Sequence, residues 1–561
     1  MADFSLPKDS YFLGFDSSTQ SLKATVLDSN LNFVTSELVQ FDTCLAHYKT
    51  KDGVYRDASI DGRVVSPTLM WVEALDLVLD KLLKSHLDFG KITAVSGSGQ
   101  QHSSVYWKNG SSSILSSLDS KVPLVDQLND AFSVKESPIW MDSSTTAQCK
   151  ELENAVGGAL QLSQLTGSRA YERFTGPQIK KIFETHPEVY NNTERISLVS
   201  SFMASLLIGR YACIDESDGA GMSLMDIKKR TWSKVLLEAT APGLEDKLGK
   251  LAPAHAVAGH IAPYFVERYK FNKDCLVIQW SGENPNRLAG LTLSTPGDLG
   301  LSLDTSDTVF GITDDPQPGL EGHVFPNPVD TKSYIVMLCY KNGSPAREGI
   351  RNRYCEGSWD RFNTYLTYAK PLNVPATDGK MSFYYTEHEI LPPLPVGFHR
   401  YILENFTGDT LEGVTVREVE QQFDPKFDEA RAVVEGQIMS MRGHAERYGM
   451  PSPPKRLIAT GSSSVNRAFL YIAACVFGCE LYTVRRSDSV SLGAALRAVH
   501  GWLCSSKGTF VPFSCLHDKN NTSLKCKLEA ISDINLVDKY ALMVKKRLEI
   551  ENCLVEKLGC M

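Results

Sequence analysis

Short apolar runs separated by polar turns make up the first hundred residues. Residues 11–16, 22–27 and 31–37 predict successive strands joined by tight turns of small and polar residues. Apolar residues then recur at helical spacing over 69–83, which predicts a helix, and the apolar run 92–95 predicts a buried strand. Polar residues follow this strand, as is typical of the carboxyl edge of an α/β sheet.

A similar pattern returns in the second half of the chain. Residues 297–313 repeat the opening hairpin, and 456–460, 466–477 and 480–484 predict a strand, a helix and a strand. A helix is also predicted over 489–502, where small residues favour close packing. We therefore interpret the chain as a pseudo-duplication in which each half opens on a hairpin and continues with α/β units.

Other segments interrupt this pattern. The serine-rich stretch 108–135 predicts a surface insertion, and 316–332, rich in Pro and Gly, predicts a loop. Residues after 507 predict a peripheral extension that ends in a charged helix over 538–558.

The turn of the first hairpin carries the first candidate chemistry. Residues 16–23 read Asp-Ser-Ser-Thr-Gln-Ser-Leu-Lys, and small hydroxylated residues in a tight turn direct backbone N–H groups and hydroxyls into one space. Such a turn can hold phosphate through backbone dipoles, and Asp16 beside it can hold a metal ion through water. A polar hairpin turn with no ligand is the ordinary interpretation. The second copy of the pattern at 301–308 favours phosphate binding.

Composition narrows the class of protein. With 561 residues, 42% of them hydrophobic, the chain is too long for one core, and two large domains are expected. A net charge of −8 argues against a nucleic-acid partner, and we expect no membrane span and no signal peptide. The 13 cysteines follow no ligand or disulfide spacing, which predicts reduced thiols, a cytoplasmic location and no structural zinc.

Five further stretches stand out, in chain order: Gly14–Gln20, Gly99–His102, Trp140–Thr146, Thr166–Pro177 and Ile214–Asp226. With these motifs the chain resembles, over residues 11–502, the FGGY family of carbohydrate kinases. The resemblance implies an α/β protein of two actin-like (RNase H-like) domains with an interdomain cleft for Mg²⁺, ATP and sugar. It also implies phosphorylation of a pentulose, with D-xylulose as the expected substrate. We place the N-terminal domain at 1–280, the C-terminal nucleotide-binding domain at 281–506 and the extension at 507–561.

The family's motifs then assign roles to particular residues. A ketose kinase needs a carboxylate that accepts the proton of the attacking hydroxyl, and the matching position is Glu283. The matched sugar ligands are His102, Arg173, Glu283 and Asn284, although Arg169 is an alternative to Arg173. Trp140 and Asp142 are expected to shape the sugar pocket, and Asp218 is as consistent with a structural role as with a functional one. The matched nucleotide-side residues are Asp16, which would also hold Mg²⁺, Thr19, Gln20, Lys23, Thr305, Ser306, Asp307, Trp359, Gly461, Ser462 and Asn466.

Several of these positions depart from the family pattern. Glu283 replaces an aspartate, and Arg287, four residues later, stands where a small residue is usual and is placed to pair with it. Asp304 and Ser462 replace glycines, and Ser103 follows His102 where close relatives have glycine. An Asp304 carboxylate about 4 Å from a phosphate charge would cost about 4 kcal/mol at an effective dielectric near 20. Two hypotheses follow: a working kinase, or a catalytically impaired member that binds sugar or a protein partner.

Overall fold

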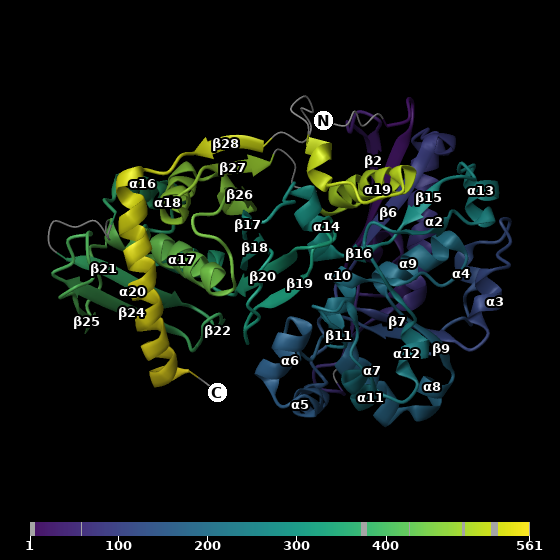
Figure 1. Ribbon diagram of the computed structural model, residues 1–561, viewed down its shortest axis with the longest axis horizontal. Helices are drawn as coiled ribbons and strands as arrows, with labels where there is room; N and C mark the ends of the chain where they lie inside the picture. The colour runs from purple at the N-terminus through teal and green to yellow at the C-terminus, as the bar shows by residue number, and fades with distance from the viewer. Residues whose placement is uncertain are drawn as a thin grey trace. The chain divides into compact units, whose positions relative to one another are not determined.

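A computed structural model of the chain describes residues 6–57, 59–371, 378–425, 427–484, 489–517 and 526–559. The chain forms two compact units (Figure 1). Unit 1 comprises Met1–Ser294, Val324–Ser333 and Asp488–Leu524, and unit 2 comprises Thr295–His323, Tyr334–Ser487 and Lys525–Met561. The two units therefore alternate along the sequence, and the division at residues 280 and 506 stays a prediction.

Unit 1 is built on a mixed sheet whose first three strands form the predicted meander. The strands lie in the order β14 (Val257–His260), β15 (Leu276–Ile278), β6 (Ile92–Gly99), β1 (Tyr11–Ser17), β2 (Ser21–Asp28) and β3 (Phe33–Gln40). β1, β2 and β3 run antiparallel in turn, while β6 and β15 run parallel to β1. The short strand β16 (Ser281–Gly282) pairs with the carboxyl end of β6. The predicted strands of the first hundred residues are thus confirmed.

Six strands of the sheet of unit 2 repeat this order. Its strands follow the order β20 (Tyr334–Tyr340), β18 (Asp307–Thr313), β17 (Asp298–Leu303), β26 (Arg456–Thr460), β27 (Leu481–Val484) and β28 (Cys526–Ala530). β17 takes the place of β1, with an antiparallel hairpin on one side and parallel strands on the other. The matching strand orders confirm the pseudo-duplication, and they place the two hairpin turns at equivalent positions of the two sheets.

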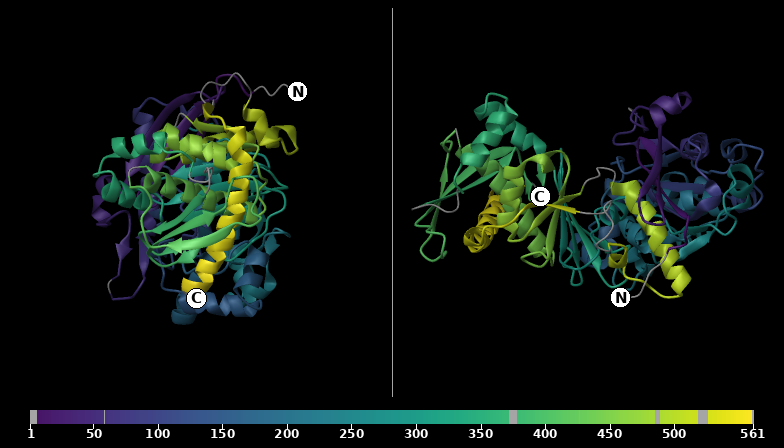
Figure 2. Two further views of the ribbon diagram at one scale, coloured as in Figure 1. Left: turned by 90° about the vertical axis from the view of Figure 1, so that its left-hand side faces the viewer. Right: turned by 90° about the horizontal axis from the view of Figure 1, so that it is seen from above.

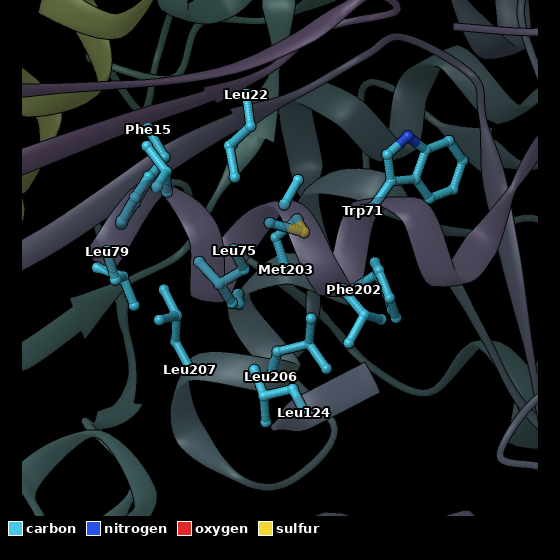
Figure 3. Packing of buried hydrophobic residues seen from close by; sticks show 14 of the residues in the cluster. Phe15, Leu22, Trp71, Leu75, Leu79, Leu124, Phe202, Met203, Leu206 and Leu207 are labelled. Carbon is cyan, nitrogen blue, oxygen red and sulfur yellow. The ribbon is translucent and has the colours of Figure 1, made fainter. Parts of the chain in front are cut away.

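The core of unit 1 lies between its sheet and the helices α2 (Thr68–Lys84) and α9 (Val199–Ile208). Leu75 of α2 and Phe202 of α9 are fully buried with Phe15 and Leu22 of the sheet (Figure 3). Burying a side chain of this size contributes about 1.5–3 kcal/mol. The apolar spacing over 69–83 predicts α2 correctly because that stripe is the face in contact with the core.

Helix α19 (Ser489–Lys507) belongs to unit 1 and packs closely on β1 and on α14 (Glu283–Gly290). Two glycines permit this approach. A Cβ added to Gly14 would lie 2.1 Å from the backbone nitrogen of Ala495, and one on Gly493 would lie 1.9 Å from the carbonyl oxygen of Asn286. The small residues therefore bring α19 directly against the segment that follows residue 282.

Two predictions about irregular segments were wrong. The stretch 108–135 contains the helices α3 (Ser111–Leu115) and α4 (Leu124–Gln127), and its scattered apolar residues belong to the core of unit 1. They are Leu115, Leu124, Leu128 and Phe132. The segment 316–332 is not all loop, because it includes the strand β19 (His323–Pro326).

The carboxyl-terminal segment is also less peripheral than predicted. β28 extends the sheet of unit 2, and α20 (Ile534–Leu558) packs on α17 (Asp428–Arg447), running lengthwise past the strands of that unit (Figure 2, left). His444 Nε2 of α17 lies 2.6 Å from Glu551 Oε1 of α20, and both side chains are buried. A charged residue of a helix predicted to be solvated, Glu551, is thus buried against a histidine of another helix.

Candidate active site

The carboxyl edge of the unit 1 sheet gathers polar side chains from three neighbouring strands. In the strand register, Asp16 of β1 lies opposite Ser98 of β6, and Ser98 lies opposite Ser281 of β16. Several buried polar atoms at this edge make no hydrogen bond within the described part of the chain: Asp16 Oδ1, Ser98 Oγ, Ser281 Oγ and Arg287 Nε. Buried polar groups are normally paired, so this concentration of unpaired atoms marks the edge as a ligand site.

Asp16 lies at this edge among charged neighbours that affect its pKa. Burial and the nearby negative charge of Glu283 raise its pKa to about 7, while the charges of Arg287 and Lys23 lower it in part. Lys23 lies opposite Asp16 in the β1–β2 register. A cation beside Asp16 would offset both the burial and the repulsion.

The donor set suits Mg²⁺ better than a metal held by protein alone. Among the residues that the structure describes, no three His, Cys, Asp or Glu side chains lie close enough together to hold a metal ion. Mg²⁺ commonly takes only one or two carboxylates and completes its shell with water and substrate phosphates. The unpaired Oδ1 of Asp16 fits that mode of binding.

Glu283 begins helix α14, directly after β16. Its Oε1 lies 2.5 Å from Nη2 of Arg287, one helical turn later, and about a third of each side chain is exposed. The ion pair expected from the spacing of these residues is therefore formed. Its consequence is that the carboxylate at the base position is held by a cation of the same helix.

His102 follows β6 and has an unusual backbone conformation, with φ of 63°. Burial and the charge of Arg173 lower its pKa to about 3, so the ring is neutral at physiological pH. Its Nδ1 lies 2.8 Å from the carbonyl oxygen of Gly221, which can only accept a hydrogen bond. Nδ1 therefore carries the proton, and Nε2 is left as an acceptor suited to a hydroxyl group.

Arg173 and Arg169, the two alternatives for a sugar ligand, have different contacts in the structure. The Arg173 guanidinium lies over the Tyr171 ring at 4.4 Å and close enough to His102 to affect its pKa. Arg169 pairs with Glu153 at 3.3 Å. Arg173 is thus the arginine that adjoins His102.

The other predicted residues of the sugar side have distinct surroundings. Trp140 Nε1 donates to Thr19 Oγ1 at 2.8 Å, which joins two of the predicted segments, and Gln20 is exposed in the same turn. Asp142 is buried and accepts hydrogen bonds from the Val64 backbone and from Gln178. The contacts of Asp142 are those of a residue that fixes the local chain.

In unit 2 the turn between β17 and β18 carries Thr305 and Ser306, both exposed. Asp307 beside them is fully buried and pairs with Arg347 of α15 (Ser344–Tyr354) at 2.6 Å. Arg347 also donates to the carbonyl oxygen of Asp304 at 3.3 Å. A buried ion pair therefore fixes the base of this turn, so Asp307 is occupied within the fold.

Asp304 contacts the turn that follows β26. Its Oδ1 accepts a hydrogen bond from the backbone N–H of Ser462 at 2.8 Å. Gly461 has φ of 88°, and a Cβ there would lie 2.6 Å from Asp304 Oδ2. The two altered positions, 304 and 462, are thus in direct contact, and the carboxylate uses an N–H group that would otherwise be available to an anion.

Trp359 and Asn466 stand at the beginnings of two helices that a hydrogen bond joins. Trp359 begins α16 (Trp359–Tyr368), is 39% exposed and lies under the guanidinium of Arg351 at 4.5 Å. Asn466 caps α18 (Arg467–Phe477), and its Nδ2 lies 2.5 Å from Asn363 Oδ1 of α16. The Trp359 side chain is therefore partly exposed beside Arg351, whereas the amide of Asn466 already has partners.

Sequence reasoning missed several residues that support the site. Gln101 accepts a hydrogen bond from the backbone N–H of Asn284 and donates to Asp218. Arg497 of α19 is fully buried and donates to Asn286, and burial lowers its pKa to about 10. A lone arginine within the small and apolar residues of 489–502 is the one signal the sequence offered for it.

The fold matches those of solved sugar kinases. The ligand-bound xylulose kinase from Lactobacillus acidophilus aligns with a TM-score of 0.73 at 18% identity, over 97% of this chain and 98% of that one. The chain therefore has the two-domain α/β fold of that kinase. No helix in the described ranges is both long enough and apolar enough to cross a bilayer.

Sequence comparison assigns the chain to a family. Residues 116–285 match the N-terminal domain, and residues 299–502 the C-terminal domain, of the FGGY family of carbohydrate kinases. The chain is 68% identical to xylulose kinase 2 of Arabidopsis thaliana over the full length of both, and 44% identical to xylulose kinase of Rattus norvegicus over 97% of each. The chain belongs to the FGGY family of carbohydrate kinases.

Proposed function

We propose that the chain is a xylulose kinase, which transfers the γ-phosphoryl group of ATP to D-xylulose and yields D-xylulose 5-phosphate. The observation that carries this proposal is the carboxyl edge of the unit 1 sheet, where Glu283, Asp16 and unpaired polar atoms meet. The full-length identity of 68% to a protein named xylulose kinase 2 supports the substrate.

The residues that bind the sugar in this proposal are His102, Arg173, Glu283 and Asn284. The neutral ring of His102 accepts a hydrogen bond from a sugar hydroxyl at Nε2, since Nδ1 is engaged by Gly221. Arg173 supplies a planar set of donors, and the Asn284 amide offers both a donor and an acceptor. Hydrogen-bond donors and acceptors of this kind suit a polyhydroxylated substrate.

The chemical step moves one proton and one phosphoryl group. The C5 hydroxyl oxygen of the pentulose forms a bond to the γ-phosphorus as the bond from that phosphorus to the bridging oxygen of ADP breaks. Glu283 accepts the hydroxyl proton, for which the carboxylate must turn from Arg287 toward the sugar.

The nucleotide side is proposed from the remaining matched residues. They are Asp16, Thr19, Gln20, Thr305, Ser306, Trp359, Gly461, Ser462 and Asn466. Mg²⁺ held by Asp16 and by the phosphates of ATP would offset the charge of the transferring group. The free thiols of the described cysteines support a reducing, cytoplasmic location.

The test is an ADP-release assay with D-xylulose and Mg-ATP, run beside a no-sugar control. Sugar-dependent ADP release, with a product phosphorylated at the C5 hydroxyl, is expected. ADP release that does not depend on D-xylulose would contradict the proposal.

A second candidate, an impaired kinase that binds sugar or a protein partner, is favoured by two contacts. Glu283 is paired with Arg287, and Asp304 takes the N–H of Ser462. The double reversion Glu283→Asp with Asp304→Gly separates the candidates. An inactive parent with an active double variant supports impairment, whereas comparable activity of both supports the working kinase.

A further inference from the structure

The turn Gly282–Asn284, which carries the proposed base and a proposed sugar ligand, is held by a chain of hydrogen bonds to a buried carboxyl group. The Asn284 backbone N–H donates to Gln101 Oε1 at 3.2 Å, and Gln101 Nε2 donates to Asp218 Oδ1, also at 3.2 Å. Asp218 Oδ2 accepts from Ser200 Oγ at 2.5 Å. Asp218 is 1% exposed, so its position is set by the interior of unit 1.

A second set of contacts holds the same turn from α19. The Gly282 carbonyl oxygen accepts from Asn286 Nδ2 at 2.8 Å, and Asn286 Oδ1 accepts from Arg497 Nη1 at 3.1 Å. Arg497 is anchored in turn by the carbonyl oxygens of Ala254 and Gln279, each at 2.8 Å. The turn is therefore fixed through a carbonyl at one end and an N–H group at the other.

The backbone of the turn is closely packed at Gly282. A Cβ added to Gly282 would lie 1.9 Å from Gln101 Oε1 and 2.7 Å from Asp218 Oδ1. Gln101 also precedes His102 directly in the sequence. A single glutamine thus links the base position, the sugar ligand His102 and the carboxyl group of Asp218.

We propose that Asp218 is a positioning residue that, through Gln101, fixes the backbone of Asn284 and thereby the placement of Glu283 against the sugar hydroxyl. The role in catalysis rests on the proposed kinase function. Displacement of a reacting group by about 1 Å can cost about 10²-fold in rate, so a contact that fixes this turn matters to turnover.

Asp218 fixes the turn by hydrogen bonding rather than by its negative charge. Burial, followed by the charge of Asp215, raises the pKa of Asp218 to about 8, while Ser200, Arg497 and Gln101 lower it in part. The two oxygens of Asp218 accept hydrogen bonds from Gln101 and from Ser200. The side chain in Asp218→Asn keeps an oxygen that accepts from Gln101, whereas that in Asp218→Ala keeps none.

The first experiment measures the stability of the turn in the absence of any ligand. Backbone amide exchange is followed by mass spectrometry in peptides that cover residues 279–288, for the full chain and for Asp218→Ala, Asp218→Asn and Gln101→Met. We expect about tenfold faster exchange at the turn in Asp218→Ala and Gln101→Met, and native-like exchange in Asp218→Asn. Asp226→Ala, in the same segment but bonded only to its own loop, is the matched control.

Two results would overturn the proposal: unchanged exchange at the turn in both Asp218→Ala and Gln101→Met, or exchange in Asp218→Asn as fast as in Asp218→Ala. Gln101 is only partly buried, so Gln101→Met keeps the test decisive if Asp218→Ala fails to fold.

The second experiment is kinetic. In Asp218→Ala we expect kcat to fall about tenfold or more with the KM for ATP unchanged, and Asp218→Asn to restore most of the loss. Equal losses in the two variants would contradict the positioning role. If the full chain releases no ADP with D-xylulose, the kinase proposal fails while amide exchange still decides whether Asp218 fixes the turn.

Discussion

Arg287 Nη2 lies 2.5 Å from Glu283 Oε1, so the carboxylate proposed as the base is already paired within its own helix. Glu283 must leave this ion pair, which joins residues one helical turn apart, before its carboxylate can reach the sugar hydroxyl. This contact gives the first prediction its direction.

Removing the cation is expected to speed the reaction. Arg287→Ser should raise kcat with D-xylulose about tenfold, because the Glu283 carboxylate no longer has to leave an ion pair to reach the sugar hydroxyl. Turnover is measured by coupled ADP release. Arg169→Ser, which removes another ion-paired arginine of unit 1, should leave kcat unchanged, and a lower kcat in Arg287→Ser would count against the inhibitory role of the pair.

Removing the base itself is expected to have the opposite effect. Glu283→Gln keeps the length of the side chain but cannot accept the proton, so kcat should fall about 10²-fold or more. The KM for the pentulose should change little, since the amide still offers an oxygen to the sugar. Unaltered turnover in this variant would exclude Glu283 as the proton acceptor.

Asp304 is expected to weaken nucleotide binding. Asp304→Gly frees the Ser462 N–H and removes a negative charge beside the turn, so the KM for ATP should fall about tenfold. Asp409→Gly, at an exposed acid of unit 2, is the control and should leave the KM for ATP as it is. The same KM in Asp304→Gly and in the parent would show that the carboxylate lies away from the phosphates.

His102 is expected to act in sugar binding as a neutral ring. His102→Ala should raise the Kd for the pentulose about fivefold to tenfold, the cost of one hydrogen bond. Because its pKa is lowered to about 3, the affinity of the parent should show no histidine titration between pH 5 and 8. Calorimetric titration checks both, with His47→Ala at the surface as the control; a step in affinity near pH 6.5 that His102→Ala abolishes would contradict the neutral ring.

Asp218 gives a pH-dependent stability of known sign. Its pKa is raised from 3.8 to about 8 in the fold, so the folded chain holds a proton that the unfolded chain loses between those values. The free energy of unfolding therefore decreases as pH rises from about 4 to 8. Asp218→Asn should be more stable than the parent by at least ~1 kcal/mol at pH 8 and equal to it near pH 4. Denaturant unfolding at both pH values measures this difference, and a constant difference would contradict the raised pKa.

Glu551 gives a pH dependence of the free energy of unfolding with the opposite sign. His444 and Arg547 hold its pKa below the ordinary value of 4.5 despite burial, so its contribution is present above that value and lost as pH falls through the folded pKa. Glu551→Gln should lower the free energy of unfolding at pH 7 by about 3 kcal/mol, since it leaves a buried partner unpaired. The loss should shrink toward pH 4. A variant as stable as the parent at pH 7 would show that α20 does not depend on this pair.

The local elements could be predicted from the sequence because their signals are local. The strand at 11–16, its partner at 22–27 and the helix over 69–83 follow from alternation and helical spacing, and all three are present. The stretch 108–135 could not be predicted in this way. Its apolar residues are few, and only the sheet and helices brought against them make Leu124 and Phe132 part of a core.

By itself the sequence determined the repeated hairpins, the motif residues of the family and the Glu283–Arg287 pair, because each depends on residues that are close along the chain. Only the tertiary structure decided that α19 packs on unit 1 and that Asp218, Gln101 and Arg497 hold the turn at Gly282. Those contacts join positions far apart in sequence, and hydrogen bonds of that kind leave no periodic pattern from which they could be predicted.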